Sequence, residues 1–250
     1  MTFNIIFPIP AGLTMELPTQ AILFLGIIPA LFFLYIALKG YEGYYKDKTI
    51  FLTFITGIFL GILAAIIRLV MNPLPLMVIF IILFAFLEQL FKTIVLNIGR
   101  LQYKKETTIY GLSLGLGFGS SFTPFLVIAG SLSGQSSTTF LTLVAIGSFG
   151  FILFHAASGA IIGYGIFSGK MTKYLFITIL LQIPFNAISD STRLQIAYSS
   201  FYYPLYQSAI VVYGAILFIY VIKKVMPKIL VDSKKRKKLK NKIKLNNQIK

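Results

Sequence analysis

The chain contains no cysteine, one histidine and few acidic residues, with seven Asp and Glu against 23 Lys and Arg. Without cysteine, disulfides, thiolate nucleophiles and Cys-based zinc or iron–sulfur centres are excluded. A catalytic zinc normally takes three protein ligands, so the single histidine, His155, makes a complete metal site hard to assemble. No Walker motif is present, so energised transport would need a separate ATPase. The sequence therefore predicts neither a metal nor another cofactor.

Charged residues are scarce as well. They make up 12% of the chain, against about 25% in ordinary soluble domains, while 57% of its residues are hydrophobic. Several apolar runs reach the ~20 residues that a membrane-spanning helix needs. The sequence predicts an all-α, multi-pass protein of the cell membrane with about seven transmembrane helices, at residues 20–39, 49–71, 74–97, 109–131, 142–167, 173–189 and 203–225.

The basic residues alternate between the connections of these predicted helices. Three connections and the C-terminal stretch carry most of them: Lys39, Lys46, Lys48, Arg100, Lys104, Lys105, Lys170, Lys173 and twelve more from Lys223 onward. Short loops rich in Lys and Arg stay in the cytoplasm. We therefore predict an outer interfacial segment at 1–19, a transmembrane domain at 20–225 and a basic cytoplasmic tail at 226–250. The N-terminus would lie outside and the C-terminus inside.

Small residues recur every four positions in three predicted spans. The second has Gly57, Gly61 and Ala65, the fourth has Gly111, Gly115 and Gly119, and the fifth has Gly159 and Gly163. This spacing lets helix backbones approach closely in lipid. It indicates helix packing, and it is also compatible with helices that surround a narrow polar interior.

Five polar residues stand out inside the predicted spans: Glu88, Lys92, His155, Gln182 and Asn186. Lipid offers them no hydrogen-bonding partner, so such groups normally face the bundle interior and contact one another. Glu88 and Lys92 are four residues apart and can pair on one helix face. The same spacing places Gln182 and Asn186 on one face of the sixth span.

Three interpretations of these polar residues remain open. They could form a hydrogen-bonded seam that fixes helix register, line a path for a translocated substrate, or hold a water activated by Glu88 and His155. Arg68, near the outer end of the second span, is expected to extend to the membrane surface instead.

The order of four motifs resembles the PrsW-type intramembrane peptidases, relatives of the CAAX prenyl-protein endopeptidases. In that family Glu-Glu-x-x-Lys is followed by a glycine-rich Gly-Phe-Ala-x-x-Glu-Asn, by His with small residues and Gly-Tyr, and by His-x-x-x-Asn. The corresponding segments here lie between about residues 50 and 190: Glu88–Lys92, Tyr110–Thr123, His155–Gly165 and Gln182–Asn186.

Four polar positions of the family pattern are occupied by other residues. Gln89 replaces the second glutamate, Phe122 and Thr123 replace the Glu-Asn pair, and Gln182 replaces the first histidine of the last motif. The resemblance implies a water activated by glutamates and histidines, with Glu88, His155, Gln182 and Asn186 as the catalytic candidates in this chain. Losing one base or donor typically lowers a rate by about 10²–10³, so we expect peptidase activity to have lapsed.

The predicted tail contains a dense basic run with no acidic residue after Asp232: Lys234, Lys235, Arg236, Lys237, Lys238 and Lys240 among others. Such a run can act as a topology signal that also contacts anionic lipid. Alternatively, it can contact nucleic acid or an acidic partner through phosphate or carboxylate groups.

The resulting hypothesis is a non-catalytic subunit of a membrane transport or import assembly. It would associate with membrane lipids and other membrane subunits, and its tail could contact a cytoplasmic ATPase or a polyanionic cargo such as DNA. One alternative is an intramembrane protease with a reduced PrsW-like site, and another is a scaffold for other membrane proteins.

Overall fold

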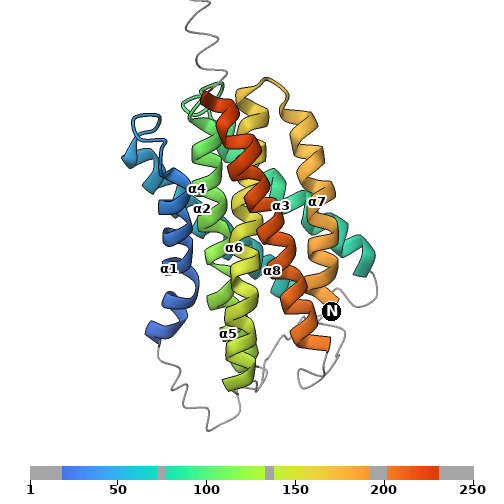
Figure 1. Ribbon diagram of the computed structural model, residues 1–250. Helices are drawn as coiled ribbons and strands as arrows, with labels where there is room; N and C mark the ends of the chain where they lie inside the picture. The colour runs from blue at the N-terminus through green and yellow to red at the C-terminus, as the bar shows by residue number, and fades with distance from the viewer. Residues whose placement is uncertain (1–18, 72–76, 133–137, 192–201, 231–250) are drawn as a thin grey trace, which may run out of the picture.

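The computed structural model describes residues 19–71, 77–132, 138–191 and 202–230, and this part of the chain contains helices and no strand. The predicted interfacial segment and basic tail lie outside these residues, apart from their innermost few positions. Figure 1 shows a bundle with these elements: α1 Thr19–Leu38, α2 Asp47–Val70, α3 Met77–Leu96, α4 Thr107–Ser120, α5 Phe122–Leu132, α6 Thr138–Phe167, α7 Met171–Ser191, α8 Tyr202–Tyr220 and a π-helical turn η2 at Val221–Val225.

Five described helical stretches are long and apolar enough to cross a membrane: Asp47–Arg68, Val78–Leu96, Thr139–Phe167, Met171–Asp190 and Tyr202–Leu230. α1 contributes a shorter apolar stretch, Leu25–Leu38. The predicted fourth span is divided at Ser121 into α4 and α5. An all-helical protein with several potential membrane spans is therefore established for the described residues, while the count of seven remains a prediction.

Large apolar side chains are exposed around the bundle. Phe59 on α2 is 69% exposed, Val78 on α3 is 71% exposed and Phe176 on α7 is 61% exposed. Water-soluble monomers rarely expose extensive apolar surface. Lipid chains, by contrast, are a suitable environment for such side chains, as expected of helices that cross a membrane.

α4 occupies the centre of the bundle, and every one of its residues is buried. It packs most extensively against α6 and then against α2 and α1. A Cβ atom on Gly111 would overlap the carbonyl oxygen of Gly159, and one on Gly115 would overlap that of His155. Gly57 of α2 approaches the carbonyl of Leu114 in the same way. The predicted use of small residues for close helix packing is therefore confirmed.

The connections that carry the basic residues gather at one end of the bundle. The α1–α2, α3–α4 and α6–α7 connections and the C-terminal end of α8 all lie at the top of Figure 1. The positive φ of 86° at Gly40, just after α1, is a conformation that glycine adopts without steric penalty. We call this end of the bundle the basic end; its assignment to the cytoplasm follows from charge alone and remains a prediction.

α7 contains Pro184 in its interior. Proline lacks a backbone N–H and disturbs the hydrogen bonds of the preceding helical turn. The hydroxyl group of Tyr213, on α8, donates a hydrogen bond of 2.9 Å to the carbonyl oxygen of Leu181 in that turn. This bond lies one residue away from Leu180, whose carbonyl loses its usual helical donor at Pro184.

Candidate functional site

A polar cluster lies between α2, α3, α6 and α7. Its titratable members are Arg68, Glu88, Lys92, His155 and Asp190, and none of these residues is more than 4% exposed. Isolated charges are unstable in so apolar an interior. The two cations and two carboxylates must therefore be compensated within the cluster.

Glu88, on α3, has a hydrogen-bonding partner at each carboxylate oxygen. Its Oε1 lies 3.2 Å from Nη2 of Arg68, and its Oε2 accepts a hydrogen bond of 2.7 Å from Nε2 of Gln182. One partner comes from α2 and the other from α7. The carboxylate thus connects three helices.

Arg68 links two carboxylates. Besides Glu88, its guanidinium group contacts Asp190 near the end of α7, with 3.1 Å between Nη1 and Oδ1. The guanidinium carbon also lies 5.0 Å from the ring centroid of Phe84 and 5.9 Å from that of Phe122. Arg68 is only 4% exposed, so the prediction that it extends to the membrane surface is wrong. The reason is that two buried carboxylates lie within its reach.

Lys92 lies one helical turn after Glu88, yet it contacts different groups. Its Nζ is 2.8 Å from Nδ1 of His155, 2.8 Å from Oγ of Ser158 and 3.4 Å from Oε1 of Gln89. An ammonium group has three protons to donate and no lone pair, and these three acceptors match that number. The expected pairing of Glu88 with Lys92 is therefore wrong: Glu88 bonds to α2 and α7, whereas Lys92 bonds to α6 and to Gln89 of its own helix.

His155, on α6, accepts from Lys92 at Nδ1, which places the ring proton of a neutral imidazole on Nε2. Nε2 is buried and has no hydrogen-bonding partner. Aromatic rings surround the imidazole: Phe122 stacks on it with centroids 5.4 Å apart and planes 18° apart, and the centroid of Phe118 lies 4.7 Å away. The phenyl ring at position 122, where the PrsW-type pattern expects a glutamate, thus packs directly against His155.

Gln182 and Asn186 share one face of α7 and extend the network. Nε2 of Gln182 donates to Oδ1 of Asn186 at 2.9 Å, and its Oε1 accepts from the amide of Gln89. Nδ2 of Asn186 donates to the backbone carbonyl of Ile81 at 3.4 Å. The amides therefore join α3 to α7 on both sides of Glu88 along the chain, at Ile81 before it and at Gln89 after it.

The structure brings together all five polar residues selected from the sequence: Glu88, Lys92, His155, Gln182 and Asn186. Sequence reasoning missed the roles of Arg68 and Asp190. Charge balance within the spans could have found Arg68, which is left as an extra positive charge once Glu88 and Lys92 are assigned to each other. Asp190 escaped notice because it lies just beyond the predicted end of the sixth span.

The cluster holds groups that could donate or accept protons, but their lone pairs and protons are largely engaged with one another. A general base must reach the proton that it abstracts, directly or through one water, and both Glu88 oxygens already have partners. Among the described residues, no three of the His, Asp and Glu side chains are grouped so that they could hold a metal ion.

The basic-tail residues proposed to contact phosphate or anionic lipid lie outside the described part of the chain: Lys234, Lys235, Arg236, Lys237, Lys238 and Lys240.

Comparison with known proteins adds no assignment, since no family model, curated protein or solved structure matches this chain.

Proposed function

We propose that this chain is a non-catalytic, multi-pass membrane subunit of a transport or import assembly, with a PrsW-like core whose catalytic pattern has been replaced by structural contacts. The observation that carries the proposal is the engagement of the Glu88 carboxylate by Arg68 and Gln182. An ion pair of this kind holds helices in place, and breaking it leaves an uncompensated buried charge. Retention of Glu88 then needs no catalytic explanation.

The environment of His155 supports the same interpretation. The Phe122 ring stacks on the imidazole and lies 5.1 Å, centroid to centroid, from the ring of Phe151. A phenyl group provides neither a base nor a hydrogen-bond donor for a developing oxyanion, which peptide hydrolysis requires. Position 122 therefore contributes packing where a peptidase would need a polar group.

The test compares the membrane proteins of cells that carry the intact chain, no chain, or the Glu88→Gln variant. Mass spectrometry of new protein N-termini would detect cleavage products, and mild-detergent purification of each tagged form would detect partners. We expect no cleavage product to depend on Glu88, and a defined set of membrane partners to co-purify with the intact chain. A cleavage product that is lost both without the chain and with Glu88→Gln would contradict the proposal.

The alternative, a peptidase with a reduced site, is favoured by one observation: Nε2 of His155 has no hydrogen-bonding partner although it is buried. A water or substrate carbonyl could use that donor if the Phe122 ring moved. This alternative predicts that His155→Ala abolishes a cleavage while Phe122→Leu, which keeps the site apolar, preserves it. A protein in which both substitutions leave every product unchanged would not be a peptidase of this kind.

Handling of a polyanionic cargo such as DNA is the more specific part of the proposal, and it rests on the basic run of the tail. Its test measures DNA binding by the purified full chain and by a form ending at residue 230, across a range of salt concentrations. Binding through Lys and Arg falls steeply with salt because condensed counterions are released. Equal binding by the shortened form would remove the tail from any role in DNA handling.

A further inference from the structure

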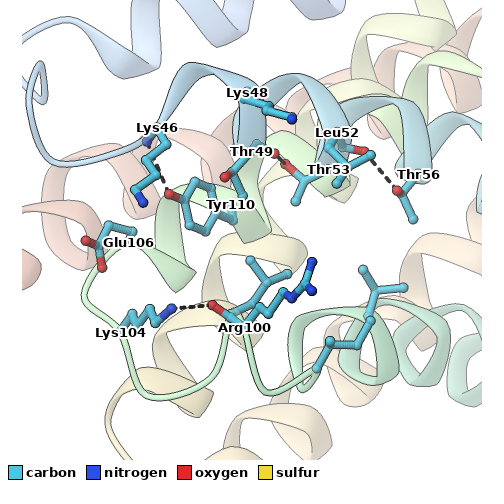
Figure 2. A pocket seen from close by; sticks show the side chains of 13 residues that line it. Lys46, Lys48, Thr49, Leu52, Thr53, Thr56, Arg100, Lys104, Glu106 and Tyr110 are labelled. Atoms are coloured by element: carbon cyan, nitrogen blue, oxygen red, sulfur yellow. Dashed lines mark hydrogen bonds between the residues drawn. The ribbon is translucent and has the colours of Figure 1, made fainter.

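A pocket opens at the basic end of the bundle, between the start of α2 and the α3–α4 connection. It has a volume of about 710 Å³. Figure 2 shows the 13 side chains that line it, and we call it the basic pocket: Lys46, Lys48, Thr49, Leu52, Thr53, Thr56, Val95, Ile98, Arg100, Leu101, Lys104, Glu106 and Tyr110.

The rim of the basic pocket is strongly cationic. Lys46, Lys48, Arg100 and Lys104 are exposed there, against one carboxylate, Glu106. Arg100 extends from the α3–α4 connection into the space beside α2 (Figure 2), and its backbone carbonyl accepts a hydrogen bond of 2.5 Å from Nζ of Lys104. The excess of positive charge indicates an anionic ligand.

The walls below the rim are apolar. Leu52 on α2 and Ile98 after α3 are 60% and 53% exposed, and Val95 and Leu101 are partly buried beside them. Lys48 and Leu52 are four residues apart on α2 and therefore share a face, with about 6 Å between their positions along the axis. The same face continues to Thr56, another ~6 Å into the apolar zone.

A cationic rim above an apolar wall matches the two ends of a membrane phospholipid. Basic pockets between membrane helices on the cytoplasmic side are suited to anionic lipid headgroups. A nucleic acid or a free nucleotide would use the cations but would leave Leu52 and Ile98 without an apolar partner. The pocket also lies at the end of the bundle where headgroups are expected.

We propose that the basic pocket binds an anionic phospholipid, with its phosphate among Lys48, Arg100 and Lys104 and an acyl chain along Leu52 and Ile98. The hydroxyl groups of Thr53 and Thr56 donate to backbone carbonyls of their own helix. They therefore have little unmet hydrogen-bonding capacity, which suits an apolar acyl chain. This site is separate from the buried polar cluster and does not depend on whether that cluster is catalytic.

The test uses the purified full chain in detergent and native mass spectrometry with phosphatidylglycerol or phosphatidylcholine as the added lipid. The pocket variant is Lys48→Gln/Arg100→Gln/Lys104→Gln. The matched control is Lys170→Gln/Lys173→Gln/Lys223→Gln, which removes the same charge from exposed residues at the same end. Each cation near an anionic lipid contributes roughly a fivefold change in affinity, so the pocket variant is expected to bind phosphatidylglycerol on the order of 100-fold more weakly.

The control variant is expected to bind phosphatidylglycerol within about twofold of the unmodified chain, since its three positions lie outside the pocket. Equal weakening in the pocket variant and the control would overturn the proposal, because the attraction would then be general. Should the triple variant fold poorly, each single substitution is expected to weaken binding about fivefold. Single variants without that effect would overturn the proposal equally.

Two further arms distinguish a lipid from a free phosphate compound. Leu52→Asn/Ile98→Asn should weaken binding of long-chain phosphatidylglycerol while leaving binding of its dihexanoyl analogue unchanged. Inorganic phosphate at the same concentration as the lipid should fail to displace it. Displacement by inorganic phosphate, or an apolar-wall variant that binds the long-chain lipid normally, would assign the pocket to a soluble phosphate instead.

Discussion

Replacing Arg68 by methionine should destabilise the folded protein severely, although the substitution keeps most of the side-chain volume. The guanidinium group lies 3.2 Å from Glu88 and 3.1 Å from Asp190, and the side chains of these carboxylates are 1% and 3% exposed. Without Arg68 the two carboxylates lose the cation they share. The other cation of the cluster, Lys92, already donates to His155 and Ser158.

Breaking a buried ion pair by removing one partner typically destabilises a protein by about 3–5 kcal/mol. Since about 1.4 kcal/mol corresponds to a factor of ten, the folded-to-unfolded ratio should fall roughly 10²- to 10⁴-fold. The assay is equilibrium unfolding in mixed micelles followed by far-ultraviolet circular dichroism, because the chain has no tryptophan to report by fluorescence. Lys173→Met, at an exposed position, is the control and should change stability by less than about 1 kcal/mol.

A third variant separates charge from packing. Arg68→Met/Glu88→Gln/Lys92→Met/Asp190→Asn removes both cations and both carboxylates of the cluster together, so no uncompensated charge stays buried. We expect it to recover at least half of the stability lost in Arg68→Met, because neutral replacements of a complete buried ion set are often tolerated. If Arg68→Met is no less stable than Lys173→Met, the ion pairs do not hold the helices together and our reasoning about the cluster is wrong.

Three other substitutions test separate contacts by the same unfolding assay. Gly115→Val should reduce the free energy of unfolding by more than about 2 kcal/mol. Any Cβ at this position overlaps the carbonyl of His155, so α4 would have to move away from α6. A neutral effect would mean that the two helices are not in close contact. Phe122→Ala should reduce it by about 3–5 kcal/mol through loss of a ring that is 2% exposed, with Phe122→Leu as the milder comparison. Tyr213→Phe, which removes only the hydroxyl that donates to Leu181, should reduce it by about 0.5–1.5 kcal/mol, and a larger loss would point to a role beyond this hydrogen bond.

Much of the architecture could be predicted because the relevant signals are local. A run of apolar residues forms a helix in lipid whatever the rest of the chain does, since its backbone must satisfy its own hydrogen bonds. Glycines four residues apart similarly mark the close faces of α4 and α6, and Gly111 and Gly159 meet there. The division of the fourth predicted span at Ser121 was not evident, because α4 and α5 are both apolar and only the turn between them separates the two helices.

The polar cluster was only partly predictable. Spacing along a helix gives the depth of a residue and the face on which it lies, so Glu88, His155 and Gln182 could be assigned to the interior. It does not say which helix faces which neighbour. For that reason Glu88 was expected to pair with Lys92, whereas it pairs with Arg68, which lies 20 positions earlier in the chain.

The amino-acid sequence by itself determined that this is a helical protein with an apolar surface, basic connections and a few costly polar groups in its spans, because each of these follows from composition and short-range periodicity. Only the tertiary structure decided how those polar groups are partnered. The contacts of Arg68 with Asp190 and of Lys92 with His155 join residues 122 and 63 positions apart. Their geometry depends on the packing angles and rotations of whole helices, which no local pattern encodes.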